Sequence, residues 1–315
     1  MASLRLGTRG SRLALAQAHM VQESLQRLHP GLDVEIVTIR TSGDRGERER
    51  LGAFVREIQE ALLANQVDVA LHCLKDLPTE PVPGLSLSAY LEREDARDTL
   101  ISRGPGLESL PEGSVIGTGS LRRTSQIANV RNDVVFKPLV GNVDTRMRKL
   151  IEGEYDAIVL ALAGLKRLGL MEDWGRSEYK ELVVWPKSVE TIVPAPGQAV
   201  LVLETREADA AAIELISPLH HSLTSACSRA ERSFLQAFGG GCSVPIGAYA
   251  QVNEHGFGMI GCVASPDGKQ YLKGNRNGSL DAPEEMGAEF ARELGGHGAF
   301  EIVQAVLATR DGGIA

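Results

Sequence analysis

Side chains that can exchange protons are concentrated in the short segment from residue 72 to residue 78. It contains His72, Lys75 and Asp76, and it follows an apolar run at residues 67–71 that predicts a buried strand. Ligands of parallel α/β sheets bind beyond the carboxyl ends of the strands, so this position favours a functional site. The alternative interpretation is a solvated Lys–Asp pair on a surface loop.

A second reactive group is the thiol of Cys242, which follows three consecutive glycines. Glycines permit unusual backbone dihedrals and let a bulky group approach the chain closely. A free cysteine is more often a small buried hydrophobic residue, but this setting favours a thiolate that forms a covalent bond. The spacing alone does not identify the group that would be bonded.

Arginines lie mostly at or just after the ends of predicted strands and at the starts of predicted helices. A guanidinium group binds a carboxylate through a planar fork that lysine cannot reproduce. In an acidic chain this placement predicts a small polycarboxylate ligand, although solvated helix faces would also explain Arg12 and Arg148. The arginines concerned are Arg9, Arg12, Arg122, Arg123, Arg146, Arg148 and Arg167.

Two stretches of the sequence repeat one pattern. Residues 4–12 and 115–123 each combine a short strand, a Gly-Thr pair, a turn with a serine, and the arginine-bearing start of a helix. A serine can cap such a helix, and its remaining N–H groups and dipole favour an anion. Two ordinary capped helices fit the same pattern, but its recurrence beside arginines favours an anion-binding cleft and two α/β domains of similar plan.

The remaining patterns set the fold class. Strand patterns at residues 34–39, 67–71, 156–162 and 199–204 alternate with helical ones, which indicates parallel α/β sheets. Beyond about residue 217 we expect a long helix from Leu219 toward Phe238, three short strands and one final helix over residues 283–308. The prediction is an α/β protein with two α/β domains and a small C-terminal α+β domain.

Composition argues against several classes of protein. The 315 residues carry a net charge of -8 and a pI of about 5.5, which disfavours a nucleic-acid-binding surface. No apolar run approaches the roughly 20 residues needed to span a bilayer. Cys73, Cys227, Cys242 and Cys262 show neither disulfide nor zinc spacing, so no metal is expected. The N-terminus enters a strand pattern without a signal or transit segment, which predicts a cytosolic location.

Taken together, six segments resemble the porphobilinogen deaminase (hydroxymethylbilane synthase) family. They occur in order over nearly the whole chain, and jointly they are highly specific. The segments are 6–11 (LGTRGS), 72–79 (HCLKDLPT), 117–123 (GTGSLRR), 141–146 (GNVDTR), 163–169 (AGLKRLG) and 240–247 (GGCSVPIG).

The resemblance implies a three-domain monomeric enzyme whose first two domains are similar to the lobes of periplasmic binding proteins. Domain 1 would comprise residues 1–91 and 192–216, domain 2 residues 92–191 and domain 3 residues 217–315. A dipyrromethane cofactor would be bonded to Cys242 through a thioether. The enzyme would extend this primer by four porphobilinogens and then release the linear tetrapyrrole by hydrolysis.

The same resemblance assigns roles to single residues. Asp76 matches the catalytic aspartate, and Lys75 its neighbour that contacts the cofactor. Further residues match positions that bind the cofactor, namely Thr118, Ser120, Arg122 and Arg123, or the substrate, namely Arg9, Ser11, Arg146, Arg167 and Gln198.

The chain departs from the family pattern at three positions. Val140 stands where the family has an arginine, which removes a cation from the expected carboxylate site. Cys73 replaces a serine and adds a second thiol near the chemistry. Ala199 replaces a glycine, so a close backbone contact there is less comfortable. We therefore expect an enzyme whose affinity or chain elongation is impaired by these changes.

Two other functions would explain part of this pattern. A non-catalytic two-lobed module that binds a carboxylate would explain the arginines, but it leaves Cys242 and its glycines without a purpose. The effector domain of a transcription regulator is disfavoured because no helix-turn-helix precedes residue 4 and the chain is acidic.

Overall fold

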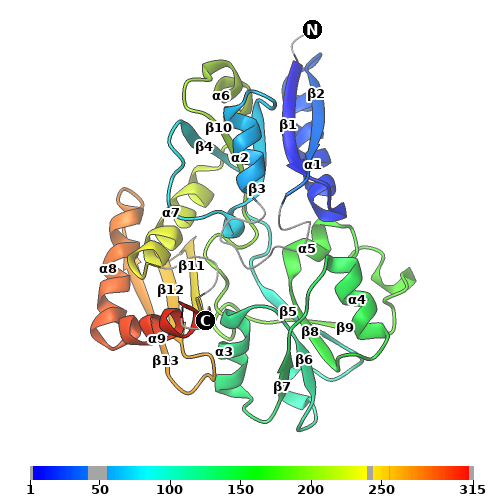
Figure 1. The fold of residues 1–315 in the computed structure, drawn as a ribbon, viewed down its shortest axis with the longest axis vertical. Helices are drawn as coiled ribbons and strands as arrows, with labels where there is room; N and C mark the ends of the chain where they lie inside the picture. The colour runs from blue at the N-terminus through cyan, green and yellow to red at the C-terminus, as the bar shows by residue number, and fades with distance from the viewer. Residues whose placement is uncertain (1–2, 42–54, 240–243, 255, 312–315) are drawn as a thin grey trace. The chain divides into compact units, whose positions relative to one another are not determined.

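The computed structural model describes residues 3–41, 55–239, 244–254 and 256–311, which form three β-sheets connected by helices (Figure 1). Internal contacts divide the chain into two compact units. The first unit comprises residues 1–94 and 197–226 and contains one sheet. The second comprises residues 95–196 and 227–315 and contains the other two.

The first unit is built on a five-stranded sheet with the order β2-β1-β3-β10-β4. Residues alternate between its two faces, so Leu4, Leu6 and Val69 pack with α1 and α6 while Ala70 packs with α2. Both faces are therefore buried. The elements are β1 (Ser3–Arg9), α1 (Arg12–Leu28), β2 (Asp33–Ile39), α2 (Arg56–Leu63), β3 (Val69–Cys73), the 3₁₀ turn η2 (Leu74–Asp76), β4 (Leu85–Tyr90), β10 (Leu201–Arg206) and α6 (Ala210–Ile216).

The second unit begins with a five-stranded sheet of order β7-β6-β8-β5-β9. Ile158 and Leu160 of its central strand pack with α4 and α5, whereas Val159 faces the opposite side and packs with α3. The elements are β5 (Asp98–Ser102), β6 (Val115–Gly117), α3 (Leu121–Val130), β7 (Val135–Lys137), α4 (Val143–Ile151), β8 (Ala157–Ala161), α5 (Leu162–Arg167) and β9 (Val183–Pro186).

These two sheets share one plan, as the sequence repeat predicted, but they are mixed rather than purely parallel. In each, three parallel strands are followed by an antiparallel one, β10 in the first and β5 in the second. Leu201 opens β10 opposite Cys73, and Asp98 opens β5 opposite Ala161. Both strands thus start at the carboxyl end of a parallel neighbour, and for that reason they run against it.

The third sheet is antiparallel and is covered by helices that follow and precede it in the chain. Phe234, Phe290 and Val303, from three different helices, share its core. The single final helix expected over residues 283–308 is wrong, because the chain breaks at Gly298, whose φ of 102° ends one helix before the next begins. The elements are α7 (Ser222–Ala237), β11 (Ile246–Asn253), β12 (Gly256–Ala264), β13 (Tyr271–Gly278), α8 (Pro283–Gly296) and α9 (Ala299–Asp311). The predicted fold class is confirmed.

A short segment at residues 192–196 joins the two sheets of the second unit. The side-chain amide of Gln126 in α3 accepts from the Val193 N–H at 2.7 Å and donates to the Val193 carbonyl at 3.0 Å. On the other side, the Ala248 N–H of β11 donates to the Pro194 carbonyl at 2.9 Å. A Cβ at Gly247 would lie 2.8 Å from the Val193 carbonyl, so only glycine permits this approach. The segment is therefore fixed between α3 and β11.

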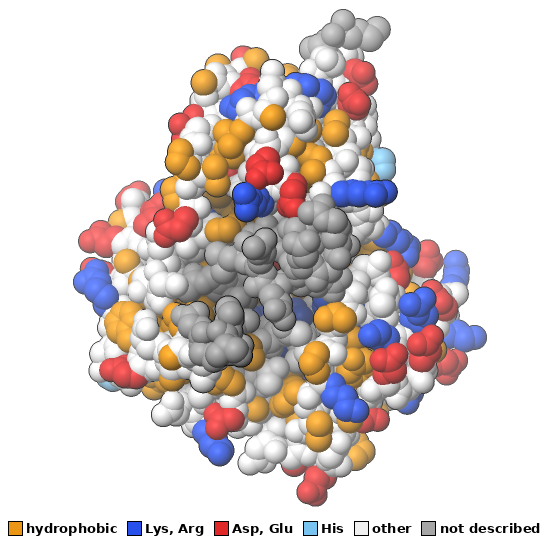
Figure 2. All heavy atoms as spheres, viewed as in Figure 1, with side chains coloured by type: hydrophobic (Ala, Val, Ile, Leu, Met, Phe, Trp, Pro, Cys, Tyr) orange, Lys and Arg blue, Asp and Glu red, His pale blue; other side chains and the backbone are white. Residues whose placement is uncertain are grey.

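The described surface carries charged side chains of both signs. Figure 2 shows acidic and basic side chains interspersed on the face drawn, without an extended basic area. Within the described ranges, no helix combines the length and the hydropathy that crossing a membrane requires.

Backbone strain is present at one of the three departures from the family pattern. Ala199 has a φ of 68°, in the left-handed region where glycine is favoured, two residues after Gly197 with a φ of 72°. Its carbonyl accepts from the Glu94 N–H at 3.2 Å, and the next carbonyl, of Val200, accepts from the Leu74 N–H at 3.0 Å. These contacts hold the segment in place, so alanine adopts a conformation that costs it roughly 1 kcal/mol or more.

We predict that Ala199→Gly stabilises the protein by up to about 1 kcal/mol, because relief of the left-handed strain exceeds the entropy that glycine adds to the unfolded chain. Urea unfolding measures the change. As a control, Ala211→Gly on the exposed side of α6 should destabilise by about 1 kcal/mol. A loss of stability in both variants would contradict the assignment of strain.

Candidate active site

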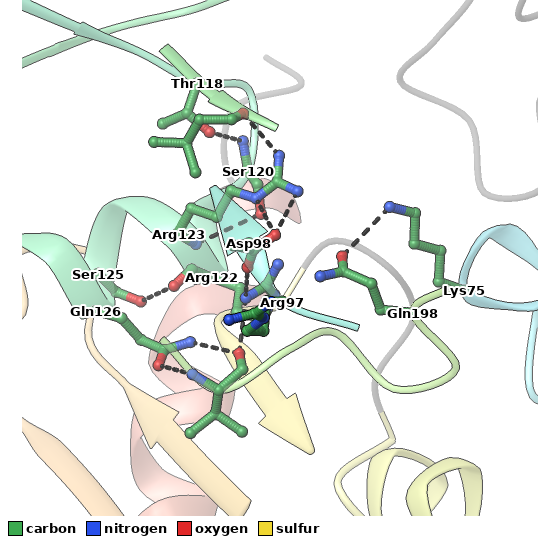
Figure 3. A network of polar contacts seen from close by, with 12 residues as sticks. Lys75, Arg97, Asp98, Thr118, Ser120, Arg122, Arg123, Ser125, Gln126 and Gln198 are labelled. Carbon is green, nitrogen blue, oxygen red and sulfur yellow. Dashed lines mark hydrogen bonds and ion pairs between the residues drawn. The ribbon is translucent and has the colours of Figure 1, made fainter. Parts of the chain in front are cut away.

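The turn between β6 and α3 places two arginines in the first turn of a helix. Ser120 caps α3, as its position in the sequence predicted: its hydroxyl accepts from the Arg123 N–H at 3.5 Å. The Thr118 hydroxyl in turn accepts from the Ser120 N–H at 3.2 Å. Arg122 and Arg123 are thereby directed inward, and they are only 5% and 7% exposed (Figure 3).

A single carboxylate binds both guanidinium groups. Arg122 Nη1 donates to Asp98 Oδ2 at 2.7 Å, and Arg123 donates to Asp98 Oδ1 through Nη2 at 2.7 Å and Nε at 3.0 Å. Asp98 is fully buried at the start of β5. Figure 3 shows it between the two arginines. We call these three residues the Asp98 cluster.

Backbone carbonyls complete the contacts of the Asp98 cluster. Arg122 Nη1 also donates to the Val193 carbonyl at 2.7 Å, and Arg123 Nη1 donates to the Val159 carbonyl of β8 at 3.0 Å. Val193 is the residue that Gln126 also binds. The cluster therefore ties α3 to β5, to β8 and to the segment that joins the two sheets.

The cluster is ionised and carries a net positive charge. Burial raises the pKa of Asp98, but the charges of Arg122 and Arg123 and their hydrogen bonds outweigh it, so the pKa lies well below its ordinary value. Burial lowers the pKa of Arg123, which Asp98 partly offsets, and arginine stays protonated at neutral pH. Two positive charges and one negative leave a net charge of +1.

The cluster still has donors for an anion. Among the hydrogen bonds within the described residues, Arg122 uses only Nη1, which leaves its Nε and Nη2 to form the planar pair of donors that suits a carboxylate. The first turn of a helix is a poor place for two cations and a good one for an anion. An added carboxylate would offset the net charge.

In the first unit, the catalytic residues expected from the sequence lie at the carboxyl end of β3. Lys75 and Asp76 form η2 and are half-buried. Lys75 Nζ donates to Gln198 Oε1 at 3.3 Å, so the structure brings together two residues that are far apart in the sequence. A Cβ at Gly197 would lie 2.8 Å from Leu74, and this close contact fixes Gln198 beside η2.

A polar network joins β3, β10 and α2. His72 Nε2 and Glu204 Oε2 are 3.0 Å apart, and Gln59 Nε2 donates to both oxygens of Glu204 at 3.0 and 3.2 Å. His72, which the sequence placed in the functional segment, is 4% exposed. It ties β3 to β10 and α2 rather than facing a ligand.

The other predicted residues lie in or beside β1, α1, α4 and α5. Arg9 ends β1, and the Ser11 hydroxyl caps α1 by accepting from the Ala14 N–H at 3.3 Å. Arg146 in α4 donates through Nε to the Gly141 carbonyl at 2.8 Å, and Arg167 ends α5.

The other two departures from the family pattern and the expected cofactor thiol lie in different surroundings. Val140, where the family has arginine, is 52% exposed. Cys73 is half-buried, with its thiol 3.6 Å from Gln17 Oε1. Cys242 lies outside the described residues, so its predicted role stays a prediction.

Sequence reasoning missed Asp98, Gln126 and Glu204. Asp98 is preceded by Arg97 in a charged stretch at residues 92–98, where a surface loop is the natural interpretation. One signal was available, because Asp98 opens an apolar strand pattern and an acidic residue buried there requires a cation. Nothing in the spacing identifies Arg122 and Arg123 as that partner.

Comparison with known proteins identifies the family. Residues 4–214 match the family model described as "Porphobilinogen deaminase, dipyromethane cofactor binding domain", and residues 225–296 match "Porphobilinogen deaminase, C-terminal domain". The chain belongs to the porphobilinogen deaminase family. The porphobilinogen deaminase of Thermus thermophilus is 44% identical over 301 residues, covering 95% of this chain and 97% of that protein. That of Syntrophotalea carbinolica is 44% identical over 311 residues, with 96% of each covered.

Solved structures give more distant similarities. An arginine-specific periplasmic binding protein of Salmonella typhimurium has a TM-score of 0.39 at 9% identity, with 71% of this chain and 94% of that chain covered. The VFT2 domain of Bordetella pertussis BvgS has a TM-score of 0.39 at 15% identity, with 68% and 85% covered. The fold class of this deaminase family member rests on its own sheets.

The described residues fit the cofactor that the family model names. A dipyrromethane carries acetate and propionate groups, and carboxylates are the anions that the remaining donors of Arg122 and the net charge of the Asp98 cluster suit. Within the described ranges there is no cluster of side chains suited to a metal ion.

Proposed function

We propose that this protein is a hydroxymethylbilane synthase, a transferase of tetrapyrrole (haem and porphyrin) biosynthesis. It condenses four porphobilinogens stepwise, with loss of ammonia, on a covalently bound dipyrromethane and releases the linear tetrapyrrole 1-hydroxymethylbilane. The observation that carries this proposal is the match to both porphobilinogen deaminase domains over residues 4–214 and 225–296.

The cofactor is bonded to Cys242 through a thioether. When bound, the dipyrromethane supplies the pyrrole carbon to which the first porphobilinogen is joined. The guanidinium groups of the Asp98 cluster support this assignment, because they offer charge and donors to its carboxylates. The residues proposed to hold it are Lys75, Asp76, Thr118, Ser120, Arg122 and Arg123.

Asp76 performs the proton transfers. Loss of ammonia breaks the C–N bond of the porphobilinogen aminomethyl group, and the Asp76 carboxyl delivers a proton to the leaving nitrogen. The carboxylate that remains stabilises the electron-poor pyrrole. When the new C–C bond forms, the ring carbon releases its proton to Asp76, which restores the acid for the next round. Lys75, whose Nζ donates to Gln198, precedes Asp76 in the same 3₁₀ turn.

Substrate carboxylates are bound by residues at the end of β1, at the start of α1, in α4, at the end of α5 and in the turn before β10. Each porphobilinogen brings an acetate and a propionate, so the product accumulates negative charge that arginines must offset. The residues proposed for this role are Arg9, Ser11, Arg146, Arg167 and Gln198. An arginine is missing at Val140, whose exposed position supports a weakened contact there.

We also propose the three-domain division into residues 1–91 with 192–216, 92–191 and 217–315. It is supported by the sheets, since each of the three lies within one of these domains. The enzyme would act as a cytoplasmic monomer on a small-molecule substrate, without nucleic acid or membrane partners. The free thiol of Cys262 suits a reducing compartment, and the interspersed charges of Figure 2 do not favour a polyanion.

A non-catalytic carboxylate-binding module of the same fold is the alternative. It would use the Asp98 cluster in the same way, but it gives no role to a carboxyl beside Lys75 at the end of β3. The two functions differ in whether the chain carries a covalent pyrrole.

We predict that the purified protein carries an added mass equal to a dipyrromethane and reacts with Ehrlich's reagent, because Cys242 forms the thioether. Intact-protein mass spectrometry measures the added mass. Cys242→Ala should lack it, whereas Cys73→Ser should retain it. An unmodified, colourless protein after expression with porphobilinogen present would favour the binding module.

We predict that Asp76→Ala folds normally and loses porphobilinogen consumption by at least a hundredfold, the lower range for loss of a general acid. The rate of substrate loss and the thermal unfolding curve are the measurements. Glu80→Ala, at an exposed carboxylate four residues later, is the matched control and should keep its rate. Normal turnover by the Asp76 variant would remove this residue from the mechanism.

A further inference from the structure

The Asp98 cluster has a composition that binding strength alone does not explain. If Arg122 and Arg123 served only to bind anions tightly, a buried carboxylate between them would be a competitor. Asp98 instead uses one oxygen for each guanidinium, at 2.7 Å in both cases. It therefore neutralises half of the positive charge at the very place where a carboxylate ligand would bind.

Asp98 also determines how the two guanidinium groups are arranged. Two adjacent cations in the first turn of a helix repel each other and oppose the helix dipole. The carboxylate between them removes that repulsion, while the carbonyls of Val193 and Val159 take further donors. Both side chains are consequently held in fixed orientations, with a net charge of +1.

We propose that Asp98 is a positioning residue that limits the Arg122–Arg123 pair to one ligand carboxylate at a time. This inference rests on the proposed function and deepens it. Because the pair can neutralise only one added carboxylate, the contact is weak enough for one pyrrole carboxylate to be replaced by another as the product grows. An arginine pair without Asp98 would bind the first carboxylates more tightly and release them more slowly.

Charge counting gives a test with three variants. Asp98→Asn leaves two uncompensated cations, Arg123→Gln leaves none, and the double variant restores one. The first readout does not depend on turnover: it is the rise in melting temperature of the protein as purified when succinate, a simple dicarboxylate, is added. We expect the rise to be larger than in the parent for Asp98→Asn, smaller for Arg123→Gln, and similar to the parent for the double variant.

The second readout is kinetic. Asp98→Asn should lower kcat without raising KM for porphobilinogen, because bound product is released slowly. Arg123→Gln should raise KM roughly tenfold, as loss of a charge-assisted contact does, and the double variant should recover most of that increase.

A merely structural role for Asp98 predicts a different pattern. In that case the double variant would be no better than Arg123→Gln in either readout, and this result would overturn the proposal. If Asp98→Asn fails to fold, the comparison between Arg123→Gln and the double variant decides alone. One outcome is that the parent protein makes no product while the three variants still shift the melting temperature with succinate in the expected order. In that case the proposed role of Asp98 holds and the proposed synthase function is wrong. If the parent protein turns over porphobilinogen but the variants do not show this order, only the proposed role of Asp98 is wrong.

Discussion

A single buried carboxylate, Asp98, is the interaction on which the second unit depends. Two guanidinium groups that are almost fully buried would be strongly unfavourable without a counter-charge, because desolvation penalises each ion. Asp98 provides that counter-charge, and the carbonyls of Val159 and Val193 complete the hydrogen bonding. Since these groups come from β5, β8, α3 and the 192–196 segment, the ion cluster also determines how those elements pack.

The same cluster links the fold to the chemistry. An acidic chain with a net charge of -8 that binds a polyanionic pyrrole must concentrate positive charge locally, and it does so at the start of α3. In the first unit, Gly197 and the strained Ala199 hold Gln198 against Lys75, which precedes Asp76 in η2. In each unit, the residues proposed to hold the cofactor thus follow the carboxyl end of a parallel strand, where such sheets bind ligands.

Much of this arrangement could be predicted from the sequence. The Gly-Thr turns, the capping serines and the strand before Asp76 gave the repeated α/β plan and placed the arginines at helix starts. What could not be predicted depends on pairing between distant residues. The antiparallel direction of β5 and β10 follows from where the chain re-enters each sheet. The partners of Asp98 and Glu204 lie 24 to 145 residues away in the sequence. Local periodicity contains no information about strand direction or about these distant partners. It also predicted one continuous helix across Gly298, where the structure has two.

The most direct test of the central claim is the pH dependence of stability for the parent protein and Asp98→Asn. The pKa of Asp98 is lowered in the folded state, so its stabilising effect is complete above the pKa of the unfolded chain and is lost as pH falls toward the folded value. In urea unfolding, the free energy of unfolding of Asp98→Asn should be about 3–5 kcal/mol lower than that of the parent at neutral pH. This difference should become smaller below about pH 4. Glu60→Gln, which removes an exposed partner of Arg56, should differ little from the parent throughout. Equal free energies of unfolding at neutral pH, or a difference that does not change as pH falls, would contradict the claim that an ionised Asp98 holds the two arginines.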